Sequence, residues 1–292
     1  MNKPVQYGGQ AVIEGVMMRG PKESAIAVRL PNGEIEITHQ PINAWSSRPF
    51  LKLPLLRGFV ALVDSLVVGT KALTFSANRS VGEEEGEELG FWEMFLTVAV
   101  ALGLGLVLFV GLPTGAANLL QGKVPGAILQ NLLEGFIRLL VFLLYILGIS
   151  RLKDIQRIFQ YHGAEHKAIF TYEAGEELTV ENSRKHPTLH PRCGTSFLLI
   201  VVVVSIVVFA FLGLKPLWWR LLSRILLMPV VAGIAYEILK FSAKHMDSPL
   251  MRLLVTPGLL LQRLTTREPD DAQLEVALAA LKGVLESGQE LT

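Results

Sequence analysis

The sequence predicts a mainly α-helical membrane protein. We expect about four transmembrane helices, a small N-terminal cytoplasmic β-hairpin element and amphipathic helices at the membrane interface. Only 18% of the 292 residues are charged while 51% are hydrophobic, and mean hydropathy is +0.44. Soluble proteins carry about a quarter charged residues. Four apolar stretches also have about the length that crosses a bilayer, roughly 20 residues. One cysteine excludes a disulfide scaffold, and 27 Lys and Arg against 26 Asp and Glu give no support for nucleic-acid binding.

Residues 1–52 are predicted to form a cytoplasmic glycine-rich segment with a β-hairpin over residues 24–40. Asn32-Gly33 suits a two-residue type I′ turn, because both residues tolerate positive φ. That turn pairs Leu30 with Ile35, Val28 with Ile37, and Arg29 with Glu36. One face of the hairpin would then be apolar, and the other would place opposite charges across from each other.

A glycine-rich motif, GGQAVIEGVMMRGP, runs from Gly8 to Pro21. It lacks the Gly-Lys-Ser/Thr of a phosphate-binding loop, so a nucleotide site is not expected. We interpret the glycines as packing positions that allow close approach of the backbone to the membrane or to the loop that contains His162. Glu14 and Arg19 are the polar residues of the motif to test.

Residues 53–90 are predicted as an amphipathic interfacial helix and an acidic linker. Charged residues at Arg57, Asp64 and Lys71 interrupt the apolar run Leu53–Ala77, so we expect it on the membrane surface or as a re-entrant element. No signal peptide is expected, because the first 50 residues contain no uninterrupted apolar core.

The predicted membrane helices occupy residues 91–149 (the first two) and 196–241 (the last two). Their expected spans are Phe91–Leu112, Leu129–Ile149, Ser196–Leu214 and Leu217–Phe241. Glu134 and Arg138 fall in the outer half of the second span, four residues apart, in the favourable order for an ion pair. Pairing and snorkelling explain them without a transport pathway.

The positive charges predict the orientation. Nine Lys and Arg precede the first span, seven lie between Arg151 and Thr195, and five follow Phe241. The two remaining loops carry only Lys123 and Lys215. The positive-inside rule therefore places both termini and the long middle loop in the cytoplasm, and the chain in the plasma membrane.

Residues 242–292 are predicted as a cytoplasmic interfacial segment followed by a C-terminal amphipathic helix. Pro269 and two acidic residues favour a helix start at Asp270–Glu286. Four leucines form one stripe along it: Leu274, Leu278, Leu281 and Leu285. The stripe must bury itself against this chain, a second copy or lipid, so we consider a homo-oligomer or a membrane-protein partner through this helix.

Residues 150–195 are predicted as a cytoplasmic metal-binding loop. His162 and His166 are four residues apart and share a face if Arg151–Tyr172 is helical, as two metal ligands often do. Glu165 lies off that line, in the place of a carboxylate that takes a proton from metal-bound water. The letters match H-x-x-E-H, the inverted zinc-protease signature.

A second cluster follows, in which His186, His190 and Cys193 surround two prolines that prevent a regular helix. His190 and Cys193 would complete a tetrahedral site for a divalent ion, and zinc is the ion expected there. Both clusters lie next to ends of predicted spans on the same side of the membrane. Glu237 and His245, at the cytoplasmic end of the fourth span, are further candidates to join.

The residues leave alternatives open. Two histidines four apart also occur as ordinary surface residues, and a lone cysteine beside a span is often a packing residue. We consider three functions: a metal-dependent hydrolase that uses Glu165 as its base, on a lipid-borne or peptide substrate; a membrane scaffold or biogenesis factor with a closed, structural metal site; and a transporter, for which only Pro229 and Gly233 give a hint.

Four segments resemble the YqhQ-like family of bacterial membrane proteins: GGQAVIEGVMMRGP, YHGAEHK, HPRCGTSF and PGLLLQRLTTREP. The resemblance runs from Tyr7 to Pro269, and the tail beyond Pro269 is expected to lie outside it. This family is described as predicted metal-dependent enzymes of unknown function. The description implies roles for His162, His166 and Cys193, the residues already singled out, and it names no reaction.

Overall fold

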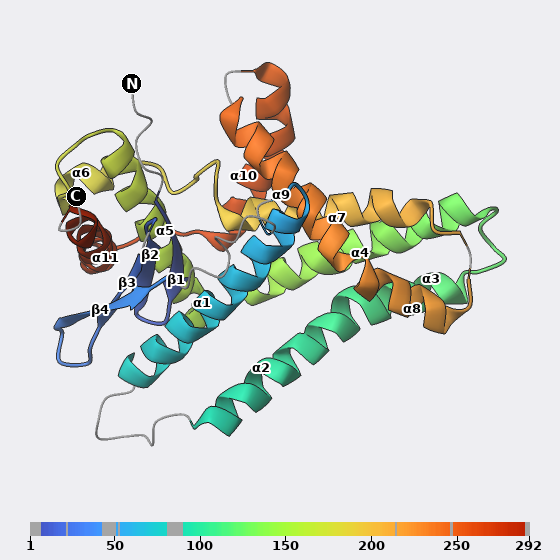
Figure 1. Ribbon diagram of the computed structural model, residues 1–292, viewed down its shortest axis with the longest axis horizontal. Helices are drawn as coiled ribbons and strands as arrows, with labels where there is room; N and C mark the ends of the chain where they lie inside the picture. The colour runs from blue at the N-terminus through green and yellow to red at the C-terminus, as the bar shows by residue number, and fades with distance from the viewer. Residues whose placement is uncertain are drawn as a thin grey trace.

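The structure is a computed structural model that describes residues 7–21, 23–42, 51, 53–80, 90–213, 215–245 and 248–289. A small β-sheet with flanking helices forms one end of the molecule, and a bundle of apolar helices extends away from it (Figure 1). The helical class and the N-terminal β element are thus confirmed. The predicted acidic linker falls outside the described residues.

The sheet has four antiparallel strands in the order β1-β2-β3-β4. Their bounds are Gly8–Val12, Gly15–Arg19, Glu23–Arg29 and Ile35–Pro41. Helix α1 (Leu56–Ser80) packs on one face, and helices α5 (Lys153–Glu173) and α11 (Asp271–Gln289) pack on the other. Because β2 and β3 are buried on both faces, they lack the apolar–polar alternation that announces a half-exposed strand.

The predicted register of the β3–β4 hairpin is wrong by one residue. Arg29 pairs with Ile35, and Val28 pairs with Glu36. The Leu30 amide donates to the Glu34 carbonyl, the Gly33 amide donates to the Leu30 carbonyl, and Gly33 alone in this turn has positive φ (+91°). This is a three-residue loop, a type I turn closed by a left-handed glycine. Pro31 favours it, because proline suits the second position of a type I turn.

The predicted C-terminal helix is confirmed as α11, and its leucine stripe packs against this chain. Leu274, Leu278 and Leu281 are buried in a core shared with β2, β3 and α5. A partner bound through this helix stays a prediction, and these three leucines are no longer free to carry it.

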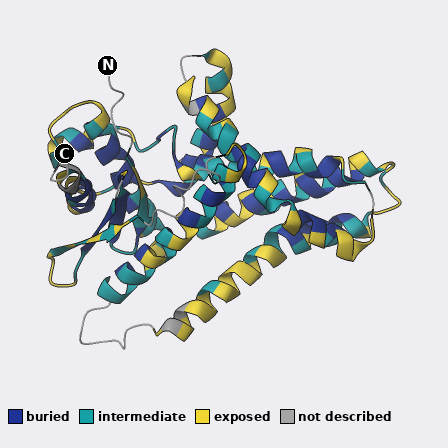
Figure 2. Ribbon diagram, viewed as in Figure 1, coloured by how far each residue is buried: buried dark blue, intermediate teal, exposed yellow. Residues whose placement is uncertain are grey.

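The bundle contains the remaining long helices. They are α2 (Phe91–Leu106), which continues through η3 (Val107–Gly111) into α3 (Leu112–Leu119), then α4 (Ala127–Ile149), α7 (Gly194–Ala210), α8 (Leu217–Leu226), α9 (Met228–Lys244) and α10 (Pro249–Thr265). Short α6 (Val180–Arg184) lies in the middle loop. Figure 2 shows α2 exposed along most of its length, as a helix facing lipid would be.

Within the described residues, three helices are long and apolar enough to cross a membrane: α1, Phe95–Leu119 and α4. The fourth predicted span is broken, since α8 and α9 meet at 44° and count as one span only if taken together. The third, α7, is shorter than the predicted Ser196–Leu214. Helix α1 passes the same test, although we expected it on the surface.

Glu134 and Arg138 form the expected ion pair, with 2.9 Å between Oε1 and Nη2, but they do not snorkel. Both are buried, and Arg220 and Arg224 of α8 reach the same carboxylate at 2.6 and 3.0 Å. We call these four residues the arginine cluster. Sequence spacing shows the pair on α4 but not the two arginines that a distant helix brings to it.

Candidate metal centre

Helix α5 holds the first two candidate ligands close to the end of α10. Gly163 allows this approach, because a Cβ there would lie 2.1 Å from the carbonyl oxygen of Arg267. The contact places His162 beside the last residue of α10, and its Nδ1 lies 2.7 Å from the Thr265 carbonyl oxygen. On the same face, the Nδ1 of His166 lies 2.5 Å from the Thr188 carbonyl oxygen.

These two hydrogen bonds decide which ring nitrogen of each histidine is free. A carbonyl oxygen only accepts, so in the neutral imidazole Nδ1 carries the hydrogen and Nε2 presents its lone pair. A backbone carbonyl behind each ring is the usual support of a metal-binding histidine. Both rings are thus oriented for coordination through Nε2, and their centroids are 4.5 Å apart.

Cys193 completes the group. It is the N-cap residue of α7, and its Sγ lies 3.1 Å from the Nε2 of His162. The ligand atoms of His162, His166 and Cys193 all lie within 4.8 Å of one another, and we call these residues the His/His/Cys trio. The Thr195 amide also donates to Sγ, at 3.4 Å. Two imidazoles and a thiolate are a donor set that zinc prefers.

Glu165 faces the trio from the side that the sequence predicts. One carboxylate oxygen lies 3.9 Å from the Nε2 of His162 and 3.8 Å from the Nε2 of His166. Glu165 is buried, and this burial raises the pKa of its carboxyl group, although the His162 and His190 charges and the backbone amide of Gly9 act in the opposite direction. The close approach expected of the glycine motif is therefore found, with Gly9 of β1 directly against Glu165.

His190 lies beside the trio but not in it. Its ring centroid is 5.5 Å from that of His166, and its Nε2 is buried with no hydrogen-bond partner among the described residues. A carboxylate oxygen of Glu173 lies 3.6 Å from this Nε2. Gln262 of α10 holds the backbone amide and carbonyl of His190, each at 2.8 Å. Its role as a ligand stays a prediction.

The other candidates lie away from the trio. Glu237 forms an ion pair with Arg57 of α1, and the His245 ring lies tilted against the Phe241 ring. In the glycine motif, Glu14 pairs with Arg157 of α5, and Arg19 pairs with Asp64 of α1. These two pairs attach the sheet to the helices on its two faces.

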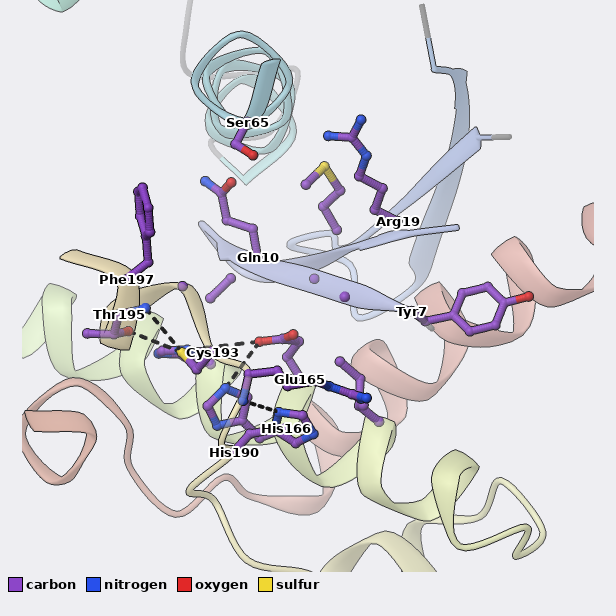
Figure 3. A pocket seen from close by; sticks show the side chains of 18 of the residues that line it. Tyr7, Gln10, Arg19, Ser65, Glu165, His166, His190, Cys193, Thr195 and Phe197 are labelled. Atoms are coloured by element: carbon purple, nitrogen blue, oxygen red, sulfur yellow. Dashed lines mark hydrogen bonds and ion pairs between the residues drawn. The ribbon is translucent and has the colours of Figure 1, made fainter. Parts of the chain in front are cut away.

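A cavity of about 830 Å³ opens beside the trio and Glu165 (Figure 3). Strand β1 and helix α5 line it, together with apolar residues of α1, α7 and α9: Ala61, Leu62, Val68, Phe197, Leu198 and Leu239. The cavity therefore combines a polar, metal-competent group of residues with apolar residues from three further helices. Sequence reasoning found the trio but not this cavity, because its walls come from distant segments.

Comparison with known proteins identifies relatives without an assigned activity. Residues 53–287 match the family described as "Protein of unknown function (DUF1385)". The chain is 38% identical over 296 residues to "Uncharacterized protein YqhQ" of Bacillus subtilis (strain 168), which covers 97% of this chain and 93% of that protein. No solved structure matches. The expectation that the tail beyond Pro269 lies outside the resemblance is wrong, since the family match continues to residue 287.

Proposed function

The chain belongs to the DUF1385 family of proteins of unknown function. From the geometry of the site, we propose that the protein is a multi-pass membrane protein and a metal-dependent hydrolase. The site would act at the cytoplasmic face of the membrane on a lipid-borne or peptide substrate. The observation that carries the proposal is the convergence of two imidazole Nε2 atoms and one sulfur on one point that a carboxylate also faces.

In this proposal the His/His/Cys trio holds a divalent ion, with zinc favoured by the sulfur ligand. Such an ion activates water and polarises a carbonyl group. Glu165 would take the proton of the attacking water and return it to the leaving group. Burial raises the pKa of Glu165, and this direction brings a carboxylate closer to the neutral range in which a general base works best.

The cavity supports a substrate from the membrane. Helices α1, α7 and α9 contribute apolar residues to its lining, and α1 and the α8–α9 pair are long and apolar enough to enter a bilayer. An apolar substrate segment would bury itself there while its polar bond reaches Glu165. A soluble polar substrate would gain nothing from such a wall.

Metal content and turnover test the proposal together. We expect the purified full chain to carry about one equivalent of zinc, and His162→Ala less than about 0.2 equivalents, because three ligands are needed to hold the ion. Elemental analysis of detergent-purified protein measures both. A wild-type protein without zinc, manganese or iron would end the proposal.

Glu165→Gln tests the proposed general base without removing a metal ligand. It should keep its metal and lose hydrolysis of fluorogenic peptides and phospholipids presented in vesicles, by about 10²-fold or more. Glu177→Gln, an exposed carboxylate outside the cavity, is the control and should keep full turnover. Full turnover by Glu165→Gln would remove Glu165 from the mechanism.

A second candidate is a membrane scaffold or biogenesis factor with a structural metal. The proximity of Glu165 to both histidines favours it, since a carboxylate ligand would give four protein donors and close the site. Loss of metal from Glu165→Gln, together with no turnover by the wild-type chain, would support this second function.

A further inference from the structure

Strand β1 is an edge of the sheet, and that edge borders the cavity. It pairs with β2 alone, and the described residues provide no further strand beyond it. Gly8, Gly9, Gln10 and Ala11 all line the cavity. Proteins usually cover or disrupt an open strand edge, because it is ready to pair with another chain. Within the part of the chain that the structure describes, no strand covers this edge on the side of the cavity.

The ladder of β1 shows which backbone groups point into this space. The Arg29 amide of β3 donates to the Glu14 carbonyl, so the next residue, Gly15, directs its backbone groups towards β1 and forms a hydrogen-bonded pair with Val12. Gly9 lies three positions before Val12, so its pair with Met18 is not a hydrogen-bonded one. Residues alternate along an antiparallel ladder, and Ala11 therefore has the orientation of Gly9. The Gly9 carbonyl and both backbone groups of Ala11 are thus directed away from β2.

The space beside this edge is a slot between two helices. Figure 3 shows Ser65 of α1 on one side of β1, and Glu165, His166 and His190 on the other side. Apolar residues from both walls, such as Leu62 and Val68 of α1 and Ile158 of α5, line the slot. Alternate side chains of an added strand would meet these two walls.

We propose that the substrate is a polypeptide, and that an extended segment of it adds to the free edge of β1 as a fifth strand. This inference rests on the hydrolase function proposed above. Strand addition gives affinity through main-chain hydrogen bonds and leaves specificity to the side-chain pockets. It would bring a peptide bond beside Glu165 and the trio. Hydrolysis there adds the hydroxyl of water to the carbonyl carbon, breaks the C–N bond and gives the remaining proton to the leaving amine.

A peptide fits the open edge better than a lipid does. An acyl chain has no group that would pair with the Gly9 carbonyl or the Ala11 amide. Both chemistries would occupy the apolar wall, but only an extended peptide uses the row of backbone donors and acceptors along β1.

The test is peptide binding to zinc-loaded, full-length Glu165→Gln protein in detergent, in which cleavage is blocked. The probe is a fluorescein-labelled octapeptide of alternating Val and Thr, and its twin is N-methylated on alternate amides so that it cannot pair as a strand. We expect the parent peptide to bind about ten-fold or more tightly than the twin by fluorescence anisotropy, because several hydrogen bonds are lost.

Two substitutions at one position locate the binding edge. Ala11→Pro removes the outward amide, which makes no hydrogen bond to β2, and should reduce the affinity for the parent peptide to the affinity for its twin. Ala11→Gly keeps this amide and should bind the parent peptide as tightly as the protein with Ala11 does. Both should retain zinc. Equal binding of the two peptides, or unchanged binding by Ala11→Pro, would overturn strand addition.

The proposed function can fail separately from this inference. Absence of zinc, or turnover that does not need Glu165, would count against the hydrolase, whichever peptide binds. Zinc together with Glu165-dependent cleavage of phosphatidylglycerol, and no preference for the parent peptide, would leave the hydrolase standing and overturn the polypeptide substrate.

Discussion

At the scale of single residues, Gly9 controls the position of the candidate base. A Cβ on Gly9 would lie 2.7 Å from the Cγ of Glu165 and 2.8 Å from the Met17 carbonyl oxygen. We expect Gly9→Ala to lower the free energy of unfolding by about 1–3 kcal/mol. It should also reduce turnover by about 10²-fold, because a carboxylate displaced by 1 Å is misaligned. Zinc content should not change.

Gly8→Ala is the matched control for this prediction, because no atom of the described residues lies within 4 Å of its Cβ position. Steady-state kinetics and elemental analysis of the two variants measure the difference. If both alanine variants had equal turnover, Gly9 would have no role in placing Glu165.

The stability of the metal-free protein should respond to pH through two groups of opposite sign. Burial raises the pKa of Glu165, so its contribution is present below the unfolded pKa and is lost as pH rises through the folded pKa. Burial lowers the pKa of His166, so its contribution is present above the unfolded pKa and is lost as pH falls through the folded pKa.

Glu165→Gln isolates the first of these two contributions. Metal-free Glu165→Gln should unfold at a higher temperature than metal-free wild type at about pH 8, and the difference should vanish towards about pH 4. Thermal unfolding in detergent measures it, with the exposed Glu286→Gln as control. A difference that grows as pH falls would reverse the assigned direction.

Much of the candidate site could be predicted from residue spacing. His162, Glu165 and His166 lie within one helical turn, so helix geometry alone brings them together. Cys193 could be expected nearby because both clusters adjoin spans that end on one side. Gly9 could not be placed, since its contact with Glu165 joins residues 156 positions apart, and only the packing of β1 on α5 creates it.

At the scale of elements, the C-terminal helix belongs to the core of the sheet end. Leu281 is fully buried in the cluster that joins α11 to the sheet and α5. We expect Leu281→Ala to reduce the free energy of unfolding by about 2–5 kcal/mol. Lys282→Ala, exposed one residue further, should change it by less than about 0.5 kcal/mol. Thermal unfolding of the full chain compares them, and equal stability would contradict this packing.

The hairpin shows why an element can be predicted while its register is not. Asn32-Gly33 marks the turn correctly, but the dipeptide fits both a two-residue loop and the end of a three-residue loop. Pro31 decides for the longer loop, and every side-chain pair moves by one position. Arg29 then reaches Glu275 of α11 rather than Glu36, and Glu36 pairs with Arg79 of α1.

The arginine cluster connects α4 to α8 through buried ion pairs inside the apolar bundle. Among the described residues, Glu134 is the one carboxylate that its three buried guanidinium groups contact. Glu134→Gln would leave these charges unpaired, and we expect a loss of about 3–5 kcal/mol in the free energy of unfolding. Glu93→Gln, exposed at the start of α2, is the control, and its glutamine can keep the cap. Equal thermal stability of both variants would show that the cluster is not needed.

At the scale of the whole molecule, the predicted orientation concerns the side of the bundle on which the sheet end lies. The sheet packs on α5 and α11, so the N-terminal segment, the middle loop and the C-terminal helix are on one side of the bundle. The predicted arrangement has this end in the cytoplasm. The loops with Gln121 and Lys215 are at the opposite end and should face outward.

Single cysteines in intact cells test this arrangement, because Cys193 is buried and should not react. A membrane-impermeant maleimide should label Gln121→Cys and Lys215→Cys from outside, and Glu34→Cys and Lys282→Cys only after permeabilisation. Leu53→Cys tests whether α1 crosses the membrane. This helix is long enough to do so, but its C-terminal half contacts the sheet. There Gly69 lies against Gln10, and the Ser76 hydroxyl accepts a hydrogen bond from the Ile13 amide. We expect Leu53→Cys to behave like Glu34→Cys, since an interfacial helix keeps both ends on one side. Labelling of Leu53→Cys from outside, with Glu34→Cys protected, would instead make α1 a membrane span.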